Sequence, residues 1–305
     1  NQTSKAIETF NQLLTNYPKS NLASKAILRQ GVVYINANDE DKAIERFKKV
    51  VNDYPGSQDA IEAVQNARIV YLDTGRSNEF ATWVKALDFV DISTAELEND
   101  VYTSAENQMA QNNNDAALKS LKDYISNYPN GLHATKAHFN IAEINYAKNN
   151  VSDAKSSYES VIKRGKSEYT EQSLVRLSNM YLTEKDKANA KRVLTQLEAD
   201  ASNDTNKLFA QSNLMKAAYD EGDTATAAKY ANILAANSKV DKRIKADATA
   251  ISARVAIKNN DTANARKLYE QLNTIGTGEL KAEALYYDAY FKNADKKYDA
   301  SNKTV

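Results

Sequence analysis

The sequence repeats one apolar pattern about every 37 residues along its length. In each copy an apolar residue is followed by two others, four and seven positions later, as in Ala43, Phe47 and Val50. The same trio recurs as Ala6/Phe10/Leu13, Phe80/Val84/Leu87, Ala117/Leu121/Tyr124, Ala154/Tyr158/Val161, Ala190/Leu194/Leu197, Ala227/Ala231/Leu234 and Ala265/Tyr269/Leu272. This spacing places the three side chains on one face of an α-helix. A period in this range predicts a solenoid, in which each repeat buries its apolar face against its neighbours.

A second helical pattern lies between successive trios. Twelve residues before each trio stands a position that is mostly small, which lets the next helix approach closely. We call it the small slot, and it holds Gly31, Arg68, Ala105, Ala142, Ser178, Met215, Ala253 and, in the last copy, Asp288. Four residues before the trio stands a residue that can cap a helix N-terminus, namely Asp39, Asn113, Asn150, Asp186, Asp223 or Asp261. Each repeat is therefore expected to be a helix–turn–helix unit.

The pattern predicts an all-α fold built from two kinds of helix. We call A helices those that carry the small slot, at 21–37, 57–74, 94–112, 132–148, 168–184, 205–221, 241–258 and 279–296. We call B helices those that carry the trio, at 3–16, 40–53, 77–90, 115–127, 152–164, 187–199, 224–236 and 262–273. Three B helices are predicted to end at Tyr-Pro, because proline cannot continue a helix: Tyr17-Pro18, Tyr54-Pro55 and Tyr128-Pro129.

The whole chain, 1–305, is expected to form one repeat array. Its repeats are predicted at 1–20, 21–56, 57–93, 94–130, 131–167, 168–203, 204–240, 241–277 and 278–305. The chain begins at Asn1 with no apolar leader, and neither end carries the polar cap that solenoids need. We therefore expect the array to be excised from a longer protein.

Composition excludes several classes of function. Lys and Arg total 40 and Asp and Glu total 40, so the formal net charge is zero, which argues against a nucleic-acid partner. No apolar run is long enough for a membrane span. The chain has no Cys, so disulfides and thiolate metal sites are absent.

Catalytic and metal-binding motifs are also missing from the sequence. The two histidines, His133 and His138, are five residues apart and so lie on different sides of a helix, unlike a zinc-binding pair. Carboxylates are abundant, but none is flanked by a motif that indicates a catalytic pocket. We predict no catalytic, cofactor-binding or metal-binding residue and no cofactor.

Seven residues of one repeat resemble the tetratricopeptide repeat: Ile27, Gly31, Tyr34, Ala43, Phe47, Val50 and Pro55. With its longer period and its Tyr-Pro turns, the chain looks like the subtype found in bacterial periplasmic Tol–Pal-associated and outer-membrane assembly proteins. The resemblance implies a right-handed α-solenoid of about eight repeats whose A helices line a concave groove that holds peptides or protein segments. It also implies a periplasmic or outer-membrane-associated location, with the cytoplasm as the alternative.

The residue after each small slot is expected to face this groove. Along the array it reads Val32, Ile69, Glu106, Glu143, Asn179, Lys216 and Arg254, which passes from apolar through acidic to basic. We hypothesise a polarised groove that reads a partner by charge order. Its predicted partner-binding residues are Tyr102, Glu106, Phe139, Glu143, Tyr146, Arg176, Lys216, Tyr219, Arg254 and Lys258. The alternative interpretation is that these charges are solvated helix faces.

The function predicted from these observations is a non-catalytic protein-interaction scaffold in the bacterial cell envelope. The alternative is a structural or oligomerisation spacer in a longer protein, which would self-associate through its uncapped ends.

Overall fold

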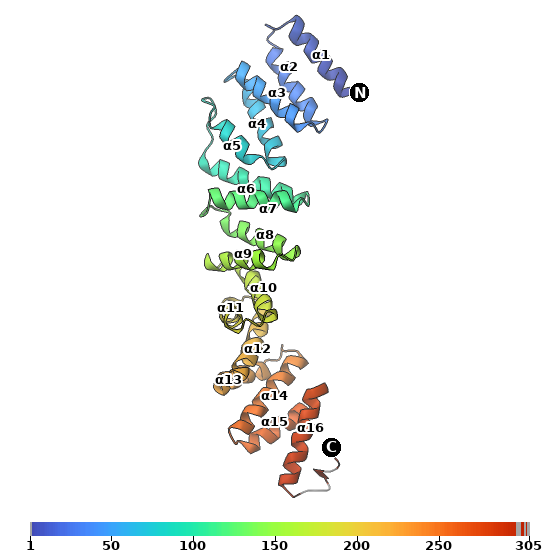
Figure 1. The fold of residues 1–305 in the computed structure, drawn as a ribbon, viewed down its shortest axis with the longest axis vertical. Helices are drawn as coiled ribbons and strands as arrows, with labels where there is room; N and C mark the ends of the chain where they lie inside the picture. The colour runs from blue at the N-terminus through green and yellow to red at the C-terminus, as the bar shows by residue number, and fades with distance from the viewer. Residues whose placement is uncertain (1, 297–299, 302, 304–305) are drawn as a thin grey trace. The chain divides into compact units, whose positions relative to one another are not determined.

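The computed structural model describes residues 2–296, 300, 301 and 303, and within that part the chain forms sixteen α-helices and no strand (Figure 1). The A helices are α2 (Ala23–Ile35), α4 (Gln58–Asp73), α6 (Thr94–Ala110), α8 (Ala134–Ala147), α10 (Thr170–Thr183), α12 (Asp204–Asp220), α14 (Lys242–Lys258) and α16 (Gly278–Ala294). The B helices are α1 (Gln2–Asn16), α3 (Glu40–Asp53), α5 (Ser77–Val84), α7 (Asn114–Asn127), α9 (Val151–Lys163), α11 (Lys187–Asp200), α13 (Thr224–Ala236) and α15 (Thr262–Ile275).

The chain divides into two compact units, 1–157 and 158–305, which are described separately. Each helix packs against the next one in the chain from α1 to α8 in the first unit and from α10 to α16 in the second. A helices also contact one another, α2 with α4 and α4 with α6 in one unit, and α12 with α14 and α14 with α16 in the other. This packing confirms the predicted all-α solenoid fold. That the whole chain forms one array remains a prediction.

Most of the predicted trios form the core, whereas Ala6, Phe10 and Leu13 of the first helix are partly buried. Ala43, Phe47 and Val50 are all 0% exposed, and burying a Phe side chain contributes about 1.5–3 kcal/mol. The small slot faces this ring: a Cβ atom on Gly31 would lie 2.4 Å from Cε1 of Phe47. Glycine is therefore required at position 31 because the neighbouring helix carries a fully buried aromatic ring.

Each A helix ends in the same tight turn. One residue there has a positive φ, and these residues follow one another at intervals of 36 to 38: Asn38, Gly75, Asn112, Asn149, Lys185, Gly222, Asn260 and Lys296. In the fifth turn, the Lys185 N–H donates to the Leu182 carbonyl (3.2 Å) and the Asp186 N–H donates to the Tyr181 carbonyl (2.9 Å). These two bonds define a Schellman motif, which satisfies carbonyls that the helix end leaves unpaired.

The residue that closes this turn also opens the following B helix. Asp186 accepts a hydrogen bond from the Asn189 N–H at 3.1 Å, and Asp39, Asp223 and Asp261 cap their helices in the same way. The predicted Asp caps are thus confirmed. One residue terminates the A helix through its own N–H and caps the B helix through its side chain.

The prediction for the third B helix is wrong, because α5 ends at Val84 and does not reach residue 90. Beyond Val84 the apolar residues stand at 87, 89, 90 and 92, too close together to share one helix face. The chain instead crosses as a loop that packs Phe89 and Ile92 against the core. Phe80 and Trp83 of α5 contact Tyr71, with ring centroids 6.0 and 6.4 Å apart.

The last repeat is shifted by one residue from its predicted register. Since Lys296 adopts the positive φ, the small slot falls on Ala289, which is buried, and not on Asp288. The first trio position then falls on Ser301, also buried, and not on Ala300. The Ser301 hydroxyl donates to the Ala289 carbonyl at 3.0 Å. The last small slot therefore holds a small residue, as in most other repeats.

Candidate functional site

The ten predicted partner-binding residues are divided equally between the two units. Tyr102, Glu106, Phe139, Glu143 and Tyr146 belong to the first unit, and Arg176, Lys216, Tyr219, Arg254 and Lys258 belong to the second. All ten lie on A helices, as predicted.

Tyr102 lies in the core of its repeat, which corrects the prediction that its side chain lines an open surface. It is 1% exposed. Its ring stacks on His133 with centroids 4.3 Å apart, and its hydroxyl accepts a hydrogen bond from Asn140 Nδ2 at 3.1 Å. Tyr102 thus joins α6 to α8, because both of these contacts come from the next A helix or its start.

Glu106 carries the first charge of the predicted series, and it is paired. Lys136 Nζ on α8 lies 2.6 Å from its carboxylate. The same ammonium lies 5.3 Å from the centre of the Tyr102 ring, so Lys136 contacts both a carboxylate and an aromatic face. Phe139 and Glu143 are partly buried, whereas Tyr146 is 40% exposed.

Two basic residues of the second unit, Lys216 and Arg254, each pair with an acidic residue on the next A helix, just as Glu106 pairs with Lys136 on the next A helix of the first unit. Lys216 on α12 contacts Asp247 on α14 at 2.6 Å. Arg254 on α14 holds Glu283 on α16 through two hydrogen bonds of 2.8 and 2.5 Å, a bidentate arrangement. Tyr219 lies under the Arg254 guanidinium at 5.8 Å.

The pKa of Glu283 reflects this arrangement. Desolvation acts to raise the pKa of its carboxyl group, but the hydrogen bonds and charge of Arg254 outweigh it, so the pKa lies below its usual value. Tyr269 adds a hydrogen bond to the same carboxylate at 3.0 Å. Glu283 therefore remains charged and joins α14, α15 and α16.

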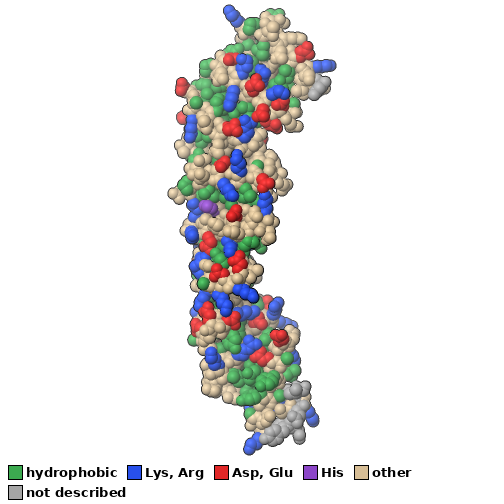
Figure 2. All heavy atoms as spheres, in the orientation of Figure 1, with side chains coloured by type: hydrophobic (Ala, Val, Ile, Leu, Met, Phe, Trp, Pro, Cys, Tyr) green, Lys and Arg blue, Asp and Glu red, His purple; other side chains and the backbone are tan. Residues whose placement is uncertain are grey.

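These pairs change the interpretation of the predicted charge order. In Glu106, Lys216 and Arg254, each charge is offset by an opposite charge on the next A helix, 29 to 31 residues later. The sequence reasoning missed Lys136, Asp247 and Glu283. An opposite charge recurring about 30 residues downstream was the signal that could have found them. Positive and negative side chains are correspondingly interspersed in Figure 2.

Apolar side chains on the A helices are exposed in the first unit. Ile69, in the slot after Arg68, is 58% exposed, and Tyr146 is 40% exposed. In the second unit Lys258 is exposed at the end of α14, and Arg176 is partly buried.

Glu171 connects α10 to the start of α12 close to Arg176. Its carboxylate accepts hydrogen bonds from the Ser202 N–H (2.9 Å) and hydroxyl (2.6 Å), the Asn203 N–H (3.1 Å) and Asn206 Nδ2 (2.7 Å). Desolvation acts to raise the pKa of Glu171, yet these hydrogen bonds lower it to about 2. The contact holds two A helices together.

No cluster of three or more His, Cys, Asp or Glu side chains in the described part of the chain could hold a metal ion. Among the helices the structure describes, none combines the length and apolar character needed to cross a membrane.

Comparison with known proteins gives a family. Residues 88–207 match the tetratricopeptide repeat-like domain, and residues 1–20 and 25–57 match the tetratricopeptide repeat. No curated protein matches the sequence significantly.

Three solved structures are among those to which the chain is similar. The C-terminal part of a TPR repeat-containing protein from Cytophaga hutchinsonii is 15% identical, with a TM-score of 0.44 over 85% of this chain and 99% of that one. PilF from Pseudomonas aeruginosa is 14% identical, with a TM-score of 0.34 over 70% and 90%. A tetratricopeptide repeat protein from Parabacteroides merdae is 11% identical, with a TM-score of 0.31 over 86% and 96%.

Proposed function

Because the chain belongs to the tetratricopeptide repeat family, whose members are generally non-catalytic protein-interaction scaffolds, we propose that it binds a protein or peptide segment through its A helices. The observation that carries this proposal is the exposure of Ile69 and Tyr146 on A helices whose charged neighbours are paired. Exposed apolar and aromatic side chains on a surface of paired charges are typical anchors for a protein partner.

We also propose that the chain does this without catalysis and in the cell envelope of a bacterium. The support for the location is the resemblance of the Tyr-Pro turns, such as Tyr54-Pro55, to those of envelope proteins of this family. The proposed binding and the proposed location are independent, since a scaffold can bind its partner in the cell envelope or in the cytoplasm.

Site-specific photocrosslinking tests both proposals. A benzophenone amino acid is placed at Ile69 or Tyr146, and at Lys122 on the exposed face of B helix α7 as a matched control. Each variant is irradiated in separate envelope and cytosolic extracts of the source organism. We expect one discrete crosslinked protein from positions 69 and 146, from the envelope extract alone, and none from position 122. Equal crosslinking at position 122 would contradict binding through the A helices, and a cytosolic partner would contradict the location.

A second candidate function is a structural or oligomerisation module. The observation that favours it is the aromatic surface of α16, where Tyr286 is 64% and Tyr290 is 55% exposed. If this function operates, sedimentation equilibrium of the full chain will show a mass that rises with concentration. Replacing both tyrosines by Ser will then abolish the rise, whereas the photocrosslinks from Ile69 and Tyr146 will remain.

A further inference from the structure

The shortened helix α5 creates a pocket that the neighbouring repeat lacks. In the repeat before it, the ring of Phe47 fills the space beside Gly31. In this repeat the corresponding positions hold Val84 and Arg68. The Arg68 guanidinium turns to Asp100 on α6, with hydrogen bonds of 2.8 and 2.7 Å. Phe80 stands where the previous repeat has Ala43, so the rings change places, and the end of α5 at Val84 leaves a space beside α4 that the following loop only partly covers.

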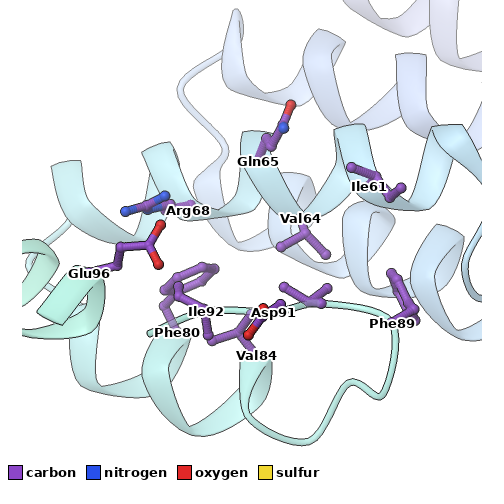
Figure 3. A pocket seen from close by; sticks show the side chains of 11 residues that line it. Ile61, Val64, Gln65, Arg68, Phe80, Val84, Phe89, Asp91, Ile92 and Glu96 are labelled. Atoms are coloured by element: carbon purple, nitrogen blue, oxygen red, sulfur yellow. The ribbon is translucent and has the colours of Figure 1, made fainter. Parts of the chain in front are cut away.

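This space is an open pocket of about 250 Å³ between α4, α5, the following loop and the start of α6. Figure 3 shows Val64 of α4 directed toward Phe80 and Val84 of α5, with Phe89 at one end and Arg68 beside Glu96 at the other. Ile61, 37% exposed, lies on the same side as Phe89. The floor is thus apolar, and the volume is below the roughly 300–1,000 Å³ of small-molecule sites. A pocket of this size suits one or two side chains.

The positive charge beside the pocket is neutralised, whereas one of the negative charges is not. Arg68 is the basic residue that lines it, and Asp100, itself almost fully buried, neutralises that charge. Asp91 on the loop is exposed and has no ion-pair or hydrogen-bond partner among the described residues. Glu96 is also exposed; its Oε2 accepts from the Ser93 N–H (2.9 Å) and hydroxyl (2.8 Å) in a capping box. Among the described residues Asp91 is therefore the pocket carboxylate without a partner, whereas Glu96 caps α6 and lies beside Arg68.

We propose that this pocket receives an aliphatic side chain of a partner peptide whose adjacent residue is Lys or Arg. The aliphatic group enters the open side of the pocket beside Ile61 and Phe89, and the cation pairs with Asp91. Charge complementarity selects this partner, since an acidic neighbour would meet the like charge of Asp91. The inference rests on the proposed scaffold function and assigns one site of it to the repeat in which the B helix is shortened.

The test is a titration of the full chain, with its Val and Ile methyl groups ¹³C-labelled, with blocked hexapeptides. The probe peptide contains Leu-Lys between Gly and Ser residues, and the comparison peptides contain Leu-Glu or Ala-Lys. We expect the Leu-Lys peptide to shift the methyl signals of Ile61 and Ile92, which line the pocket, in a saturable way. We expect the Asp91→Asn variant to weaken that binding about two- to fivefold, the effect of one exposed ion pair. The matched control Asp88→Asn removes a charge from the same loop without lining the pocket, and it should leave binding unchanged.

Each other result has a defined meaning. Equal binding of the Leu-Lys and Leu-Glu peptides, or equal weakening by Asp88→Asn, would overturn the charge selection. Absence of any methyl shift at millimolar peptide, or equal shifts with the Ala-Lys peptide, would overturn the pocket. In either case photocrosslinking at Ile69 and Tyr146 would still report separately on the scaffold function, because neither residue lines the pocket.

Discussion

Lys185 is the position at which a single substitution should stabilise this chain. It adopts a φ of +60° in the turn between α10 and α11, where most other repeats use Asn or Gly. A residue with a Cβ atom pays about 1–2 kcal/mol for this left-handed conformation. Asn relieves part of the cost by local hydrogen bonding, but the Lys side chain has no such bond among the described contacts.

The expected gain follows from two opposing terms. Lys185→Gly removes the steric cost of about 1–2 kcal/mol but adds about 0.5–1 kcal/mol of backbone entropy. At the middle of both ranges the net stabilisation is about 0.75 kcal/mol. In a unit of this size such a gain raises the melting temperature by about 1–4 °C. Lys185→Asn should give a smaller gain.

The matched control is Lys185→Ala, which removes the same charge and chain length but keeps the Cβ atom. It should change stability little. The measurement is urea unfolding followed by circular dichroism, together with hydrogen exchange of the Asp186 amide, which donates to the Tyr181 carbonyl in this turn. Exchange should slow about two- to fivefold in the Gly variant. If Gly and Ala variants were equally stable, the argument from positive φ would be refuted.

Three further predictions concern packing, pH and capping. Gly31→Ala should destabilise the chain, because overpacking against the Phe47 ring costs about 1–3 kcal/mol, which exceeds the gain of about 1 kcal/mol in helix propensity. In a Phe47→Leu background the same change should stabilise the chain. A double-mutant cycle followed by urea unfolding measures the difference between the two backgrounds. Because the pKa of Glu171 is lowered to about 2, its contribution is present above about pH 4.5 and is lost as the pH falls toward 2; the urea midpoint of Glu171→Gln should therefore be lower than wild type at pH 7 and converge with it near pH 2. Asp261→Ala should cost about 0.5–2 kcal/mol by removing the cap of α15, whereas Asp261→Asn should cost much less, as thermal unfolding will show.

The repeat architecture was predictable from sequence because it depends on local and periodic information. Trios such as Ala43, Phe47 and Val50 report a helix face directly, and caps such as Asp186 lie within four residues of the helix they start. The end of α5 was missed because the periodic expectation was extended past Val84, although the apolar spacing beyond it had already changed. The last register was missed since it depends on the conformation of Lys296, a residue type that seldom signals a turn.

The candidate surface was less predictable because it depends on contacts between repeats. Tyr102 was expected on an open face, but the next A helix brings His133 against its ring. Glu106 and Lys216 were expected to present charge, but their partners lie about 30 residues away. Position on a helix indicates the direction in which a side chain points, whereas the neighbouring repeat determines what it meets.

The turns that close each A helix also bear on how such a chain can change its length. The two hydrogen bonds that define the turn at Lys185 are made within six residues, from Tyr181 to Asp186. No partner from another repeat is needed to form it. Duplication or loss of one whole repeat therefore leaves every remaining junction chemically complete, and small differences in repeat length fall in the loops that follow the B helices. Such a junction stays intact when an array gains or loses a repeat, whereas side-chain pairs between repeats, such as Glu106 with Lys136, must then be matched again.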